Sequence, residues 1–289
     1  MKTAIIVDST AYLSDELAEH ADVYQVNLSV TFSDGAVGPD SRDQAGQLAF
    51  YHRLVSERQL PTTSQPVPGD YYDVLDEIVA KGYDVVYCIH ISSGISGTFQ
   101  TAKMITSEYQ DRLTVFCIDS KGASVLMEGL VQQTLRLSDS ALTPDEIYDK
   151  LLWVAQNSRI YLMVEDLNNL VKGGRLSAAA ALVGGMLKVR PVLMFDAEGK
   201  IVVYEKIRTN KRVYQCWLKL AHQAIEDFPD GIDISFAHSA AYDEINSVKD
   251  VFQKHLPEIN FRISGLGPVV GTHTGAGTKG FCFIPIAKN

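Results

Sequence analysis

The sequence has no excess of positive charge and no long apolar run. Its 289 residues include 26 Lys and Arg against 35 Asp and Glu, which gives a formal net charge of −9. A broad nucleic-acid or anionic-membrane surface needs clustered positive charge, so we expect no nucleic-acid partner. No apolar run approaches the roughly 18 residues of a membrane span, and the start MKTAIIVDST turns polar too soon for a signal peptide. These absences predict a cytoplasmic protein.

Cysteine motifs and nucleotide-binding loops are also missing. The four cysteines lie far apart, without a C-x-x-C pair or histidines at metal-ligand spacing, so we expect reduced thiols and no metal site. The G-x-x-x-x-G-K-[ST] loop that binds ATP phosphates is absent. GAGTKG at 275–280 has the form G-x-G-x-x-G, but a strand-like run follows it where the dinucleotide motif requires a helix. It is predicted to be a glycine turn, and no cofactor is expected.

Short β-branched runs alternate with helical patterns in the first half of the chain. These runs are apolar throughout, which is typical of strands covered on both faces, so we predict a parallel sheet flanked by helices. The predicted strands lie at 3–7, 23–30, 84–91 and 113–119, and predicted helices include 97–110 and 123–138.

The pattern changes after a helix that is predicted to begin at TPDE, with Thr143 as N-cap, and to run to about Asn157. Two strand-like runs then flank the short turn DAEG at 196–199, so they should pair antiparallel within a mixed sheet. Further strands are predicted at 159–164, 232–237, 259–263 and 281–286, and helices at 209–228 and 241–255. The sequence thus predicts two α/β domains: a three-layer parallel-sheet domain over 1–157 and a mixed-sheet domain over 158–289.

Two loops in the first half are rich in hydroxyl groups. HISSGISGTFQTA at 90–102 carries Ser93 and Ser96 between a predicted strand and a predicted helix, where backbone N–H groups and the helix dipole favour an anion. LPTTSQP at 60–66 holds Thr62 and Thr63 between prolines that stiffen the loop, although a surface turn that caps the next helix is an equally good interpretation.

Two basic spots and one apolar stretch are further candidates for parts of a ligand-binding site. Arg175 follows two glycines in LVKGGRLS, either as a solvated cation after a helix end or close to a bound anion. Arg208 belongs to the basic cluster EKIRTNKR. The stretch 176–195 is mostly small and apolar, so it forms core or lines an apolar tail. Together with the hydroxyl loops, it points to an amphiphilic ligand.

A serine hydrolase is the alternative hypothesis. SGISG at 93–97 falls one residue short of the G-x-S-x-G nucleophile pattern. Ser96, His273 and either Asp8 or Asp119 could supply the nucleophile, base and acid of an acyl hydrolase acting on a lipid or ester. Whether these groups meet depends on the fold.

Taken together, the motifs closely resemble those of the DegV family of bacterial fatty-acid-binding proteins. The resemblance covers nearly the whole chain and rests on VDST (7–10), TTSQP (62–66), SSGISGTFQ (92–100), DS (119–120), KGGRLS (172–177), LKVRPVL (187–193), KIRT (206–209) and GPVVGTHTGAG (267–277). It implies a two-domain α/β carrier with no catalytic residue of its own, which holds a long-chain fatty acid between or within its domains.

The resemblance also implies roles for single residues. The carboxylate is expected to bond Thr63 and Ser96, with Thr62 and Ser93 in the same ligand-binding loops and His273 near the head group. Members are described as presenting the acid to a separate ATP-dependent fatty acid kinase subunit, related to dihydroxyacetone kinases, which forms acyl phosphate for phospholipid synthesis. Arg208 and His273 are then expected on the face that meets the kinase or the phosphate, with Arg175 as a further candidate. Transient contact with a membrane is an additional expectation.

The physical chemistry of the ligand agrees with a carrier. Burying the roughly 14 methylenes of a 16-carbon chain at ~0.8 kcal/mol each gives on the order of 11 kcal/mol before association costs. The tail can therefore supply the affinity while the hydroxyl groups fix the orientation of the carboxylate. Small residues such as Ala180 and Gly184 are predicted to line the acyl tail.

Overall fold

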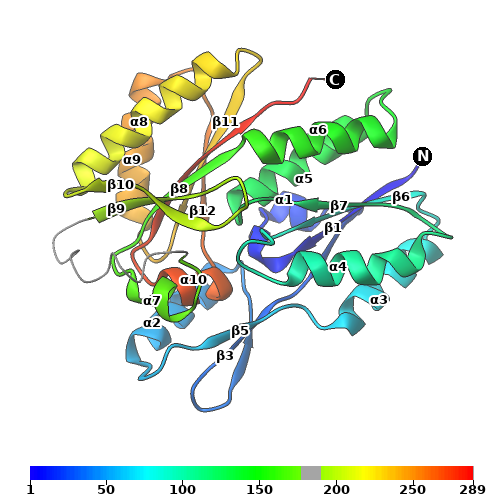
Figure 1. Ribbon diagram of the computed structural model, residues 1–289, viewed down its shortest axis with the longest axis horizontal. Coiled ribbons are helices and arrows are strands. Elements are labelled where there is room, and N and C mark those ends of the chain that lie inside the picture. Colours follow the sequence, from blue (N-terminus) through cyan, green and yellow to red (C-terminus); the bar gives the residue numbers. More distant parts are fainter. Residues whose placement is uncertain (177–189, 289) are drawn as a thin grey trace.

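The structure, a computed structural model, describes residues 1–176 and 190–288 (Figure 1). Ala180 and Gly184, predicted to line an acyl tail, lie outside the described residues. Within the described ranges, no helix is both long enough and apolar enough to cross a membrane.

The first half of the chain forms a four-stranded parallel sheet covered by helices on both faces, as predicted. The sheet order is β2-β1-β6-β7, with β1 (Thr3–Asp8), β2 (Val23–Val26), β6 (Val85–His90) and β7 (Thr114–Asp119). Alternate residues of β1 point to opposite faces. Ile6 packs with α3 (Pro68–Ala80) and α4 (Thr98–Thr106), whereas Ile5 packs with α5 (Val125–Ser138). Figure 1 shows α3 and α4 on one side of this sheet and α5 and α6 (Pro144–Asn157) on the other.

The second half forms a mixed six-stranded sheet, also as predicted. Its order is β10-β9-β8-β13-β11-β12, and β11 and β12 pair in parallel while the other pairs are antiparallel. The strands are β8 (Arg159–Met163), β9 (Arg190–Phe195), β10 (Ile201–Ile207), β11 (Ile232–His238), β12 (Phe261–Gly265) and β13 (Lys279–Pro285). Helices α8 (Asn210–Asp227) and α9 (Tyr242–His255) cover its outer face.

Three predictions from short sequence motifs, a helix cap and two turns, are confirmed. Thr143 forms the predicted capping box with Glu146 at the start of α6, which ends at Asn157. The turn at 196–199 joins β9 to β10 antiparallel. Gly275 and Gly277 have positive φ angles of 77° and 81° in a turn that leads into β13 and opens no helix.

The prediction of one strand over 23–30 is wrong. The run is divided between β2 and β3 (Ser29–Thr31), because the N–H of Leu28 donates to the Ser9 hydroxyl at 3.0 Å and the chain leaves the first sheet. β3 pairs antiparallel with β4 (Val37–Pro39) and β5 (Thr62–Ser64) in a third small sheet. This sheet packs against α2 (Gln44–Ser56) and α10 (Pro268–Thr274). The short elements are η1 (Ser9–Ala11), α1 (Asp15–Ala18), η2 (Ser107–Tyr109) and α7 (Asn168–Lys172).

The two large sheets share one apolar core. Helices α5 and α6 lie between them, and α5 contacts β1 and β6 on one side and β11 and β13 on the other. Ile5 of the first sheet and Ile284 of the second belong to the same buried cluster. The predicted boundary between 157 and 158 falls between α6 and β8, and it stays a prediction.

A buried carboxyl group connects the end of β1 to α10. Asp40 accepts hydrogen bonds from the Ser9 hydroxyl at 3.0 Å, from the Tyr12 hydroxyl at 3.1 Å and from the Val269 N–H at 2.9 Å. Burial raises the pKa of Asp40 to about 7, and the nearby charge of Asp8 acts in the same direction against the three hydrogen bonds. An aspartate in an unfolded chain has a pKa of about 3.9. Folded protein therefore retains a proton on Asp40 in a pH range where the unfolded chain has released it.

This linkage predicts that Asp40 lowers stability as the pH rises from about 4 to about 7. Unfolding releases the proton in that range, so raising the pH favours the unfolded state. Relative to Asp40→Asn, which cannot titrate, the wild-type protein should lose a few kcal/mol of unfolding free energy between pH 4.5 and pH 8. Denaturant titrations at several pH values measure this difference.

Asp34→Asn is the matched control. Asp34 is exposed, and its carboxylate accepts a hydrogen bond from the Ala36 N–H, which lowers the pKa of Asp34. Asp34 is therefore already ionised over most of the pH range from 4.5 to 8. The Asp34 variant should follow the wild-type profile from pH 4.5 to pH 8. Parallel profiles for wild type and Asp40→Asn would show that Asp40 titrates at its ordinary pKa.

Candidate functional site

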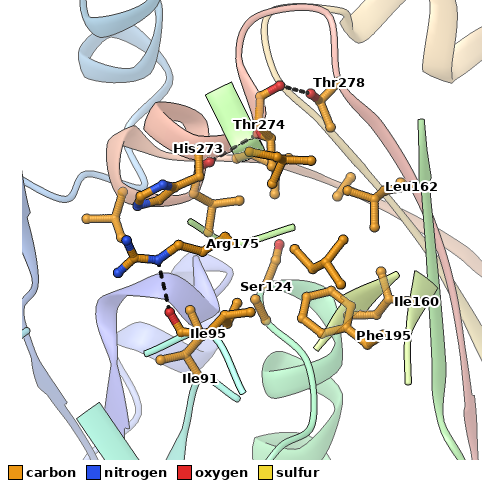
Figure 2. A pocket seen from close by; sticks show the side chains of 18 of the residues that line it. Ile91, Ile95, Ser124, Ile160, Leu162, Arg175, Phe195, His273, Thr274 and Thr278 are labelled. Carbon is orange, nitrogen blue, oxygen red and sulfur yellow. Dashed lines mark hydrogen bonds between the residues drawn. The ribbon is translucent and has the colours of Figure 1, made fainter. Parts of the chain in front are cut away.

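A cavity lies where the loop after β6 meets the inner face of the mixed sheet, with α10 along one side (Figure 2). Its space is about 840 Å³ when the open solvent at its mouth is counted, and only a small part of this space admits a water molecule, so the cavity is narrow. Most of its walls are apolar. The apolar side chains are Leu28, Ile91, Ile95, Ala123, Val125, Ile160, Leu162, Leu170, Phe195, Ile201, Ala237, Leu266, Val269, Val270, Phe281 and Cys282.

The positively charged and imidazole side chains lie at one end of this cavity. Figure 2 shows Arg175 and His273 at one end and Phe195 at the other. Thr63 from β5 also lies at the polar end, because its hydroxyl is 2.9 Å from Nε2 of His273. Arg175 Nε donates to the Ile95 carbonyl at 3.2 Å, which places the guanidinium next to the loop that carries Ser96. The cavity is therefore amphiphilic along its length.

His273 is neutral in this setting. The ring is partly buried and its Nδ1 is shielded from water, without a hydrogen-bond partner among the described residues. Burial of the ring, together with the positive charge of Arg175, lowers the pKa of His273 to about 4. At neutral pH, Arg175 is then the one fully charged side chain among the described residues that line the cavity.

Two glycines before Arg175 allow this arrangement. A Cβ atom on Gly173 would lie 2.3 Å from Nδ1 of His273, so only glycine leaves room for the ring. Gly174 has a positive φ of 72°, a conformation that favours glycine, and it turns the chain after α7. The glycines thus both end a helix and bring Arg175 to the cavity, where it is half-buried.

The structure brings together four of the predicted site residues: Thr63, Ser96, Arg175 and His273 all line the cavity. The other three lie outside its lining. Thr62 precedes Thr63 on β5 and is exposed, because neighbouring strand residues point to opposite sides. The Ser93 hydroxyl donates to Asp119. Arg208 is exposed in the connection between β10 and α8.

Sequence reasoning missed several lining residues. Ser124 follows β7 with a positive φ of 56°, and its hydroxyl is buried without a partner among the described residues. Thr274 and Thr278 also line the cavity, but they donate to backbone carbonyls of Val270 and Thr274 respectively. The hydroxyl-rich run IDSKGAS after a predicted strand was the signal that could have identified Ser124.

The groups of the hydrolase alternative do not form a relay. Asp8 accepts hydrogen bonds from the Ile91 N–H at 2.8 Å and lies 3.3 Å from Nδ1 of His90. Asp119 binds Ser93 and Lys121. The Ser96 hydroxyl is 2.9 Å from that of Thr98, while His273 pairs with Thr63. Neither acid therefore orients His273, and no described group of three His, Cys, Asp or Glu side chains could hold a metal ion.

Comparisons with known proteins agree with this architecture. The family model described as "Uncharacterised protein, DegV family" matches residues 2–286. A DegV domain-containing protein of Staphylococcus aureus is 33% identical over 285 residues, which is 98% of each chain. The crystal structure of a fatty acid binding DegV family protein from Streptococcus agalactiae has a TM-score of 0.90 at 33% identity and covers 100% of both chains.

A stearic acid-binding protein from Eubacterium ventriosum has a TM-score of 0.86 at 27% identity, over 99% of this chain and 98% of its own. The match of the family model along almost the whole length, together with these relatives, identifies the chain as a member of the DegV family.

Proposed function

We propose that this protein is a cytoplasmic carrier that binds a long-chain fatty acid in the amphiphilic cavity and presents its carboxylate to a separate ATP-dependent fatty acid kinase. The observation that carries the proposal is the division of the cavity into a long apolar part and one polar end. The similar structures from S. agalactiae and E. ventriosum, described as fatty acid binding and stearic acid-binding, support the class of ligand.

The narrow apolar part suits an unbranched acyl chain. Its walls come from five strands of the mixed sheet, the start of α5 and α10, which surround a slot and leave few polar atoms along it. Each methylene removed from water contributes about 0.8 kcal/mol, so the tail supplies most of the affinity. Chain length and unsaturation then depend on where the slot ends.

The polar end suits a carboxylate. Arg175 offers the positive charge, and the hydroxyl groups of Thr63 and Ser96 and the ring of neutral His273 offer uncharged hydrogen-bonding groups. A carboxylate buried without partners would cost several kcal/mol, which these groups offset. Because most of these partners are neutral, the carboxylate oxygens keep their capacity to attack a phosphate delivered from outside.

The direct test is native mass spectrometry of gently purified protein. The protein should carry a noncovalent ligand with the mass of a fatty acid, and delipidated protein should rebind palmitate or stearate. Protein that never carries or rebinds a fatty acid would contradict the proposal, as would hydrolysis of acyl esters that depends on Ser96.

Removing the hydroxyl groups of Thr63 and Ser96 should weaken binding less than it weakens transfer. One neutral hydrogen bond is worth about 0.5–1.5 kcal/mol, so Thr63→Val or Ser96→Ala should raise Kd by about ten-fold at most. Acyl-phosphate formation with the kinase should fall further, because transfer depends steeply on the alignment of the carboxylate. Kd by titration and turnover with the kinase are measured for the same samples.

Thr62→Val and Ser93→Ala are the matched controls, since both hydroxyl groups lie in the same two segments but outside the cavity lining. They should bind lipid as the wild type does. Loss of binding in the controls, or full transfer in the Thr63 and Ser96 double variant, would show that the head group lies elsewhere.

Arg208 is proposed to meet the kinase. It is exposed and outside the cavity lining, so Arg208→Ala should leave the lipid content unchanged. The rate with the kinase should fall, and by a larger factor at low salt than at high salt, because an exposed charge contact is screened by ions. Lys206→Ala, which removes a nearby exposed charge, is the control. An empty cavity in the Arg208 variant would overturn this role.

Gly173 should be required for ligand binding although it offers no side chain. Gly173→Ala places a methyl group 2.3 Å from the original position of Nδ1 of His273, so the ring must move away from Thr63. We expect about ten-fold weaker fatty-acid binding. Gly69→Ala in α3, where an added Cβ meets nothing within 4 Å, is the control and should bind normally. Equal affinities for the two variants would show that the position of His273 does not matter for the ligand.

A further inference from the structure

Two of the four cysteines lie side by side in the parallel sheet. Cys88 of β6 and Cys117 of β7 are direct partners in the strand register, and both belong to the core beneath α3 and α4. Neighbouring strands are about 4.8 Å apart, which is within the Cα separation of about 4.4–6.8 Å that a disulfide spans. The sequence gives no sign of this pair, because 28 residues separate Cys88 from Cys117.

The two thiols differ in their access to solvent. β7 is the edge strand of the sheet, and Cys117 on it is half-buried, whereas Cys88 on the next strand inward is fully buried. The Thr106 hydroxyl of α4 lies 3.4 Å from the sulfur of Cys117. Cys117 is therefore the more exposed of the two residues, and Cys88 is its buried neighbour.

The surroundings of Cys117 favour its thiolate. Interaction with the Cys88 thiol lowers the pKa of Cys117 against the opposing effect of burial, and the Thr106 hydroxyl, His90 and Lys103 lower it as well. The same pairing and burial raise the pKa of Cys88. By contrast, burial and the Glu205 carboxylate raise the pKa of half-buried Cys216 to about 11, so a thiol of similar exposure is poorly reactive.

We propose that Cys88 and Cys117 form an oxidation site that responds to hydroperoxides by closing a disulfide between β6 and β7. In the first step the Cys117 thiolate attacks a peroxide oxygen. The O–O bond breaks, a sulfenic acid forms, and the leaving oxygen takes a proton to become water or an alcohol. In the second step the Cys88 sulfur attacks the sulfenic sulfur, the S–O bond breaks, and water leaves as the disulfide forms. Two thiols lose two electrons and the peroxide gains them.

The site is independent of the lipid cavity. Cys88 and Cys117 lie on the face of the sheet covered by α3 and α4, whereas Ile91 and Val125 face the cavity from the other side. Oxidation should therefore leave a bound fatty acid in place. The outcome of the oxidation experiment does not depend on whether the protein binds a lipid.

The experiment treats reduced full-length protein with stoichiometric hydrogen peroxide, blocks free thiols under denaturing conditions and maps them by peptide mass spectrometry. We expect one intramolecular Cys88–Cys117 disulfide, with Cys216 and Cys282 recovered as free thiols. Oxidation at Cys117 should be at least about ten-fold faster than at Cys216.

Variants separate the two steps. In the Cys88→Ser variant, oxidation should stop at a sulfenic acid on Cys117, which dimedone traps. In the Cys117→Ser variant, Cys88 should stay reduced. The Cys216→Ser variant should behave as the wild type. Wild-type protein that keeps both thiols reduced, oxidises Cys216 first, or forms dimers through Cys117 would overturn the proposal. The wild-type measurement decides the question even where a variant folds poorly.

Discussion

The carboxyl end of β1 holds the walls of the cavity in place. Asp8 accepts the Ile91 N–H, which fixes the start of the loop that carries Ser96. The Ser9 hydroxyl accepts the Leu28 N–H and donates to Asp40, and Asp40 in turn accepts the N–H of Val269 in α10. Ile91, Leu28 and Val269 all line the cavity. Two adjacent polar residues therefore fix segments that are far apart in the sequence, and their burial makes each hydrogen bond costly to lose.

This arrangement explains why the polar end can be assembled from distant parts of the chain. Thr63 and His273 are 210 residues apart, and their contact requires the small sheet, α2 and α10 to pack as one unit. The loop after β6 is held from the other side by the turn at 196–199. The Ser92 hydroxyl donates to the Gly199 carbonyl at 2.8 Å, and a Cβ on Gly94 would lie 2.4 Å from the same oxygen. Both large sheets thus contribute to the position of Ser96.

The electrostatics of the cavity follow from burial more than from the number of charges. Burial keeps His273 neutral and Asp40 protonated to about pH 7, so Arg175 provides the charge at the polar end among the described lining residues. A single cation surrounded by neutral hydrogen-bonding groups can hold a carboxylate and still leave its oxygens able to act as nucleophiles. The parallel sheet separates this site from the cysteine pair, because its two faces are covered by different helices.

The sequence by itself determined the α/β class, most strands and helices, and the hydroxyl loop after β6, because those signals are local runs, caps and turns; the segment TTS was predicted as a loop but forms the strand β5. It singled out Thr63, Ser96, Arg175 and His273, all of which the structure places on the cavity. Only the tertiary structure decided that Ser93 binds Asp119, that Leu28 turns away from the first sheet to meet Ser9, and that Ser124 joins the lining. It also decided that His273 is neutral and that Cys88 lies beside Cys117. These outcomes depend on contacts between distant residues and on burial, which no local pattern contains.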